Sequence, residues 1–308
     1  MCIRDRLRGE ASTSSGDKGG LPTFDMTVVK RWSQVAREAR RDNRKINLAR
    51  LFGFCFENYA ELEESDPRRK FKYRVVVAGN AIVDQSMDAA TFANLGAEPT
   101  TMRDGKLLDF YASLPNNSGG QADAENAYIQ SEFVGTETWV ALPEEAWPEE
   151  WQEDMSYRYD PPVVRLLRSL YGHPDSGSFW EEHAKDQLTK VGFSYMGASI
   201  FWHEELRLLL GVYVDDLKMA GPEANIAQGW ELIRTVISIT PPSGFDHYMG
   251  CMHRVFELET DGSPEGAFEH LFARDGTTVV RDPAKAPQEP RQHPERERTR
   301  EDPPTELT

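Results

Sequence analysis

Cysteine is scarce in this sequence, and long apolar runs are absent. The 308 residues include 3 cysteines, Cys2, Cys55 and Cys251, which lie far apart and form no Cys-x-x-Cys pair. This pattern disfavours both a disulfide-stapled scaffold and a zinc ribbon. Apolar stretches such as residues 208–214 are far shorter than the ~20 residues that a membrane-spanning helix needs. The basic start is not followed by an apolar stretch of the secretory type. We therefore expect a soluble, intracellular protein with no membrane partner.

Positive charge is also in short supply, and it is unevenly distributed. The chain has 35 Lys and Arg against 51 Asp and Glu, a formal net charge of -16, which on its face argues against a nucleic-acid partner. Residues 1–120 nevertheless carry a net charge of +3, whereas residues 121–160 carry -10 and residues 257–308 carry -6. The basic residues gather in two clusters, residues 30–50 and 68–74. The first is as compatible with a solvated helix face as with a binding surface. The second alternates Lys and Arg along a predicted strand, which would place several cations on one face.

The two ends of the chain have little apolar content. Residues 1–27 are rich in Gly, Ser and Thr, and residues 257–308 are rich in Pro, Arg and Glu, so both are predicted to be disordered. The first six residues also resemble the translation of a sequencing adapter, and we interpret them as an artefactual start. A folded core of about 220 residues remains, consistent with one domain or two small ones.

Periodicity predicts helices and strands in the same core, which is an α+β pattern. Helices are expected at residues 28–44, 100–113, 178–191 and 225–238. Strands are expected at residues 46–56, 71–78, 200–203, 206–214 and 217–220, with a further short strand ending near Asp123. The last strand pair would be joined at Asp215-Asp216.

The two adjacent carboxylates at the tip of this hairpin are the most informative feature. Asp215 and Asp216 end the apolar run of residues 208–214. Charges at the end of a buried strand are costly unless something compensates them, and a divalent cation is the usual compensation. An exposed acidic turn is the alternative. A two-metal site for phosphoryl transfer needs a further carboxylate from another strand. Asp123, at the end of its own short strand, is the best candidate.

Several short motifs occur in an order that resembles one family, the reverse transcriptase of copia-type retrotransposons. The matching residues are Lys70-x-Lys72-x-Arg74, Asp123-x-x-x-Ala127-Tyr128, Leu170-Tyr171-Gly172, Trp180, Tyr213-Val214-Asp215-Asp216 and Tyr248-Met249-Gly250. The resemblance covers residues 32–253, about two-thirds of the chain. It implies a right-hand polymerase, with a palm made of an antiparallel sheet with helices on one face, together with fingers. Residues 28–120 would form a fingers-like region and residues 121–256 the palm, whereas the thumb and the ribonuclease H domain would be missing.

The same resemblance implies roles for individual residues. Asp123, Asp215 and Asp216 would be the catalytic carboxylates that bind two Mg²⁺ ions, and the Ala124 carbonyl would add a ligand. Tyr128 would exclude a ribose 2′-hydroxyl, with a core aromatic as the alternative. The resemblance implies Lys72, Arg74, Ala124 and Tyr128 as the nucleotide-binding residues. Lys72 and Arg74 would contact the incoming triphosphate, with an exposed basic strand as the alternative.

The implied partners are those of a polymerase. They are dNTPs and an RNA or DNA template with its primer, and in the family an integrase and a ribonuclease H domain belong to the same polyprotein. Tyr248 to Gly250 would lie near the primer end. The main alternative is an inactive truncated fragment that keeps the palm fold, with or without nucleic-acid binding. Another palm-like nucleotidyl transferase or cyclase is a third.

The chain also departs from the family pattern. Asp175 stands where relatives have a Gln that would meet nucleotide and template. The expected nucleotide pocket therefore differs from that of the family at this position. We interpret the neighbouring His173 as a structural residue, because it has no evident carboxylate or Cys partner.

Overall fold

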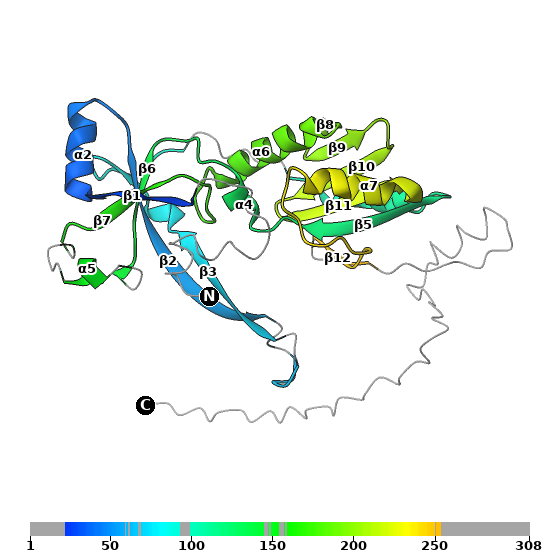
Figure 1. Cartoon of the computed structure of the whole chain (residues 1–308), viewed down its shortest axis with the longest axis horizontal. Helices are drawn as coiled ribbons and strands as arrows, with labels where there is room; N and C mark the ends of the chain where they lie inside the picture. The colour runs from blue at the N-terminus through cyan, green and yellow to red at the C-terminus, as the bar shows by residue number, and fades with distance from the viewer. Residues whose placement is uncertain are drawn as a thin grey trace, which may run out of the picture. The chain divides into compact units, whose positions relative to one another are not determined.

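The computed structural model of the chain is a mixed α and β structure (Figure 1). It describes residues 22–58, 60, 62–66, 69–92, 99–144, 147, 149–153, 157, 159–249 and 251–253. None of the helices in these ranges combines the length and the apolar character that a membrane crossing demands. The predicted tail at residues 257–308 and residues 1–21 of the predicted disordered start lie outside the described residues.

Short helices and strands alternate along the described part of the chain. The elements are β1 (Phe24–Arg31), α2 (Trp32–Arg41), β2 (Asn47–Asn58), β3 (Lys70–Val77), the 3-10 helix η2 (Gly79–Ala81), β4 (Val83–Asp84), α3 (Met102–Ala112), β5 (Asn117–Asp123), α4 (Ala127–Gln130), β6 (Thr138–Ala141), α5 (Glu149–Gln152), β7 (Pro162–Leu166), α6 (Ser176–Lys190), β8 (Phe193–Gly197), β9 (Ile200–His203), β10 (Leu208–Tyr213), β11 (Asp216–Pro222), α7 (Glu223–Arg234), β12 (His247–Tyr248) and β13 (Cys251–Met252).

The first sheet has the strand order β1-β7-β6-β2-β3, and β4 pairs with β2 beside this path. All pairings in it are antiparallel except β2 with β6, which is parallel. One face forms a core that includes Leu51, Val77 and Val164. On the other face, the apolar side of α2 packs with Ile46 and Leu48 of the β2 segment. In the described residues, no packed cluster places a helix over the part of β2 that follows Leu48 on this face.

The start of this sheet differs from the predicted helix at residues 28–44. Residues Phe24–Arg31 form β1, and the helix begins only at Trp32. β1 pairs with β7, where Lys30 lies opposite Val163 and Arg31 opposite Pro162. Residues 24–27, expected in the disordered start, are therefore part of a strand. The pairing partner lies more than a hundred residues away in the sequence, so local periodicity carries no sign of it.

The second sheet has the order β5-β11-β10-β9-β8 and is antiparallel throughout. Leu208 and Leu210 of β10 pack in one cluster with Trp180 of α6 and Trp230 of α7, so these two helices cover one face (Figure 1). α3 covers the opposite face, where Leu108 packs with Ile200 and Ala220. The prediction of helices on one face is therefore wrong: the face opposite α6 and α7 also has a helix.

The two sheets do not follow the predicted division of the chain at residue 120. β6 and β7, which lie after that boundary, belong to the first sheet. α3 lies before the boundary, yet it packs on the second sheet. The chain thus crosses between the sheets more than once.

Candidate active site

The β10–β11 hairpin ends in a tight turn made by Val214 and Asp215. Tyr213 and Asp216 are the last paired residues, so Asp216 belongs to β11 and is not in the turn as predicted. Val214 has a φ of 53°, a left-handed conformation that is uncommon for a β-branched residue and costs about 1–3 kcal/mol. The indole Nε1 of Trp180 donates a hydrogen bond of 2.7 Å to the Val214 carbonyl. Trp180, in the buried face of α6, therefore helps to hold this turn in its strained shape.

Asp123 lies directly opposite Asp216 in the β5–β11 pairing. Directly opposed residues of antiparallel strands point to the same face, with Cβ atoms roughly 4.5–5.5 Å apart. The backbone around Asp123 is fixed from both sides. The Asp123 N–H donates to the Thr240 hydroxyl at 2.9 Å, and the Asp123 carbonyl accepts from the Thr240 N–H at 2.8 Å. On the other side, the Ala124 N–H donates to the Asp215 carbonyl at 2.6 Å. The structure thus brings the three predicted carboxylate residues, Asp123, Asp215 and Asp216, to the same end of the second sheet, which we call the carboxylate edge.

The donor set at this edge fits a hard divalent cation. Asp215 and Asp216 are half-buried and Asp123 is exposed, so solvent and a substrate reach the edge while two carboxylates stay partly shielded. Magnesium commonly takes one or two carboxylates together with water and substrate phosphates. Within the described residues, no group of three carboxylate, His or Cys side chains is already arranged to hold a metal. Asp123, Asp215 and Asp216 are the residues of this edge that could hold such a cation, and their side chains would have to rearrange to do so.

Tyr128 lies beside the turn. It follows the buried Ala127 at the start of α4, and it lines a small cavity of about 50 Å³ with Trp180, Val212 and Val214. Burial raises the pKa of the Tyr128 hydroxyl, and the nearby Asp215 charge raises it further. Its ring packs against the Tyr171 ring with centroids 4.3 Å apart. The phenol is therefore neutral and held in place next to the hairpin tip.

The Leu170-Tyr171-Gly172 segment attaches β3 of the first sheet to this region. The Val77 N–H donates to the Tyr171 carbonyl at 2.8 Å. Gly172 has a φ of 89°, and a Cβ built on it would lie 2.1 Å from the Val77 carbonyl oxygen. Only glycine permits this close approach of two backbones. The Leu170-Tyr171-Gly172 motif thus has a structural cause, and it brings the basic strand β3 towards Tyr128.

Arg74 is the basic nucleotide-binding candidate whose side-chain contacts the structure describes. It is exposed on β3, and its guanidinium carbon lies 5.4 Å from the Phe56 ring centroid and 5.9 Å from that of Tyr171. Lys72 occupies β3 opposite Phe56, but its side chain lies outside the described parts. Tyr171 contacts both Arg74 of β3 and Tyr128, which lies beside the hairpin turn. It therefore connects the basic strand to the turn, and we call this contact the Tyr171 bridge. Tyr171 is a site residue that the sequence motifs did not single out, although its place before an obligatory glycine was a usable signal.

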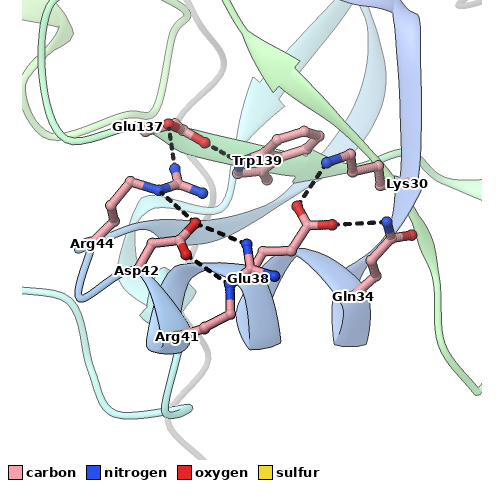
Figure 2. Close-up of polar contacts among 8 residues, drawn as sticks. All are labelled: Lys30, Gln34, Glu38, Arg41, Asp42, Arg44, Glu137 and Trp139. Atoms are coloured by element: carbon pink, nitrogen blue, oxygen red, sulfur yellow. Dashed lines mark hydrogen bonds and ion pairs between the residues drawn. The ribbon is translucent and has the colours of Figure 1, made fainter.

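In the other basic cluster, at residues 30–50, three cations, Lys30, Arg41 and Arg44, are paired with acids (Figure 2). Lys30 and Glu38 form a 2.7 Å ion pair, and Gln34 donates a further hydrogen bond to Glu38. Arg44 pairs with Glu137 at 3.0 Å. Arg41 pairs with Asp42 at 2.8 Å, and the indole of Trp139 donates to Glu137. These contacts favour the solvated helix face over a free binding surface for this cluster.

The two departures from the family pattern are both buried. His173 is 5% exposed, and its ring lies edge-on to Phe92 and Phe133 at centroid distances of 5.2 and 4.8 Å. Its Nδ1 accepts a hydrogen bond from the Asp175 N–H at 3.2 Å. Asp175 is the N-cap of α6, and burial raises the pKa of its carboxyl group. Both residues therefore pack within the protein at the start of α6.

A buried cation on β11, which sequence reasoning missed, lies two residues after Asp216. Lys218 is fully buried. Its Nζ contacts Asp109 of α3 at 2.5 Å and His253 Nε2 at 3.0 Å, and it lies 4.9 Å from the Tyr248 ring centroid. Burial lowers the pKa of Lys218, and Asp109 opposes that effect. This cluster joins α3 and the β12–β13 hairpin to the strand that carries Asp216.

Comparisons with known proteins add little to this geometry. No family model and no curated protein match the sequence. Among solved structures, the chain is similar to a telomerase from Candida albicans in complex with a TWJ fragment of telomeric RNA, with 9% identity, a TM-score of 0.33 and coverage of 71% of this chain. The match spans 43% of that telomerase chain. A likeness at this level assigns neither a fold family nor an activity to this chain.

Proposed function

We propose that the chain is a template-directed DNA polymerase of the reverse-transcriptase type, and more narrowly the polymerase region of a copia-type retrotransposon polyprotein. The observation that carries the proposal is the direct pairing of Asp123 with Asp216 beside the tight turn at Asp215. The second sheet would be the palm and the first sheet the fingers. An RNA or DNA template with its primer, together with dNTPs, would be the substrates.

The proposed mechanism assigns each residue a physical task. Asp123, Asp215 and Asp216 would hold two Mg²⁺ ions, with the Ala124 carbonyl as a further oxygen ligand. The ions, when bound, would offset charge on the attacking 3′-oxygen and on the leaving pyrophosphate. Arg74 would grip the triphosphate, because a planar guanidinium binds phosphate oxygens in pairs, and Lys72 would add a second positive charge.

Tyr128 is proposed to select deoxynucleotides. Its contact with Tyr171 and the nearby Trp180 leave its ring little freedom. A fixed ring under the sugar would leave no room for a 2′-hydroxyl. The buried Asp175 does not take over the task of the family Gln in this proposal, since it lies at the N-cap of α6 and is 9% exposed.

Primer extension tests the proposal. Purified chain, a primed template, Mg²⁺ and dNTPs should give extended primer, and Asp215→Asn should lower the rate at least about a thousandfold, because a carboxylate in the metal site is lost. Asp186→Asn removes an exposed acid on α6 and serves as the matched control, with no change expected. Extension that survives Asp215→Asn would refute the assigned role. Primed-template binding without any incorporation by the wild type would favour the inactive fragment.

A further inference from the structure

Tyr248, the last residue of β12, has a buried hydroxyl without a hydrogen-bond partner. The residue is 3% exposed, and its phenol oxygen makes no hydrogen bond within the described residues. The Thr100 hydroxyl lies beside it, but it is directed at two backbone carbonyls, one of which is that of Val212 at 2.9 Å. Val212 pairs with Leu217, the residue after Asp216. The phenol therefore lies at the level of the carboxylate edge, and an unpaired buried hydroxyl there needs an explanation.

The ring of Tyr248 is held from two sides. It lies over Gly105 of α3, where an added Cβ would be 3.5 Å from Tyr248 Cε1. The ammonium group of Lys218 lies 4.9 Å from the ring centroid, and it is itself fixed by Asp109 of α3 and by His253. These contacts use the ring and leave the hydroxyl available for another partner.

The hydroxyl also lies on the same side of β11 as Asp216. Side chains alternate along a strand, so Asp216 and Lys218 point to one face, whereas Leu217 packs in the core beneath α6 and α7 on the other. Burial raises the pKa of the Tyr248 hydroxyl, and the charge of Asp216 raises it further. The phenol is therefore a neutral donor that the charge of the Asp216 carboxylate reaches.

Two other carboxylates lie near the phenol, and each is fixed by its own contacts. Asp104 accepts from the N–H and the hydroxyl of Thr101 at 3.0 and 2.5 Å, which closes the start of α3. Asp109 accepts from Lys218 at 2.5 Å. Asp216, by contrast, belongs to the group of side chains that have to rearrange before they can hold an ion.

We propose that Tyr248 is a positioning residue for the carboxylate edge, whose hydroxyl donates a hydrogen bond to the Asp216 carboxylate and orients it towards a divalent cation. Carboxylates that bind metals are commonly held by such hydrogen bonds. A phenol suits this task because it donates without adding charge. The inference rests on the metal site of the proposed function, but metal binding can be measured without catalysis.

Titration of the full chain with Mn²⁺, followed by electron paramagnetic resonance, tests the proposal. Mn²⁺ serves as the probe because it prefers the same oxygen ligands as Mg²⁺. Tyr248→Phe removes the hydroxyl and keeps the ring, and it should weaken Mn²⁺ binding about tenfold, since loss of such a hydrogen bond typically costs 10–100-fold in metal affinity. The urea midpoint should stay unchanged or rise, because an unpaired buried hydroxyl has been removed. A merely structural role would instead lower the urea midpoint and leave Mn²⁺ affinity unchanged.

Tyr111→Phe is the matched control. The Tyr111 hydroxyl donates to the Arg207 carbonyl at 2.9 Å, at the opposite end of α3 from Gly105. Its removal should change Mn²⁺ affinity less than twofold. An equal loss of affinity in the Tyr111 and Tyr248 variants would refute a specific role for Tyr248.

Asp216→Asn identifies the acceptor and separates the two proposals. In that background Tyr248→Phe should change Mn²⁺ affinity less than twofold, because the two residues act through one contact; a tenfold loss that persists there overturns the assignment to Asp216. If Asp216→Asn weakens Mn²⁺ binding and Tyr248→Phe does not, this inference fails and the metal site stands. If the wild-type chain binds no Mn²⁺, or binds it equally well after Asp216→Asn, the metal site of the proposed function fails and this inference fails with it.

Discussion

At the scale of single residues, His173 links stability to pH. Burial lowers its pKa from 6.5 to about 4, so the folded protein holds it neutral while the unfolded chain protonates it near pH 6.5. The stability that this neutral ring contributes is complete above pH 6.5 and is lost as the pH falls towards 4.

We expect His173→Leu to remove part of the acid sensitivity. Between pH 7 and pH 5 the wild type should lose about 2 kcal/mol more free energy of unfolding than the variant, because only the wild type has this buried ring to protonate. Urea denaturation of both proteins at the two pH values measures the difference. Parallel losses in the two proteins would show that His173 is not the titrating group.

Trp180 and Trp202 give a second comparison at this scale. Trp180→Phe removes the donor to the strained Val214 carbonyl and leaves space beside the small cavity, so a cost of about 2 kcal/mol is expected. Trp202→Phe removes a hydrogen bond to exposed Glu204 and should cost about 0.5 kcal/mol. Urea midpoints give the stabilities, and primer extension should fall only for Trp180→Phe. Equal effects in both assays would contradict the role of Trp180 in holding the turn.

At the scale of elements, the contact between β3 and the segment before α6 depends on two backbones that nearly touch. Gly172→Ala would place a Cβ 2.1 Å from the Val77 carbonyl oxygen and should cost at least about 3 kcal/mol, or prevent folding. Gly197 has a similar positive φ of 106°, but a Cβ there meets nothing within 4 Å.

Gly197→Ala is therefore the control for backbone conformation alone, with an expected cost of about 1 kcal/mol. Thermal and urea unfolding of both variants measure the difference. Should the two variants be equally stable, the close approach of β3 to Gly172 would not contribute to the fold.

The elements that the sequence predicts well are those whose evidence is local. The hairpin of β10 and β11 follows from an apolar run broken by two acids, and α6 from apolar residues at helical spacing. β1 was missed because its partner β7 is distant, and pairing outweighs the helical spacing of Val29, Trp32 and Val35. The sequence did not predict that α3 covers the second face of the second sheet. The spacing of its apolar residues indicates a helix, but it does not indicate which sheet or which face the helix packs against.

At the scale of the whole molecule, the net charge of -16 proves a poor guide to where charge is free to act. In the described residues, three cations of the cluster at residues 30–50, Lys30, Arg41 and Arg44, are paired with acids, whereas Arg74 lies against two aromatic rings. The order of motifs predicted that Asp123 would meet Asp215 and Asp216. The Tyr171 bridge and the buried Lys218 could not be predicted, because each depends on contacts among segments far apart in the sequence.

The pairing of Asp123 with Asp216 has a consequence for how this protein can vary. Side chains alternate along a strand with a period of two, so a shift of one residue in the pairing moves each side chain to the opposite face. A single inserted or deleted residue in β5 would direct Asp123 towards the apolar layer beneath α6 and α7, although no amino acid had been replaced. Descendants of this sequence should therefore accumulate substitutions around the carboxylate edge far more readily than changes in the length of β5 or β11.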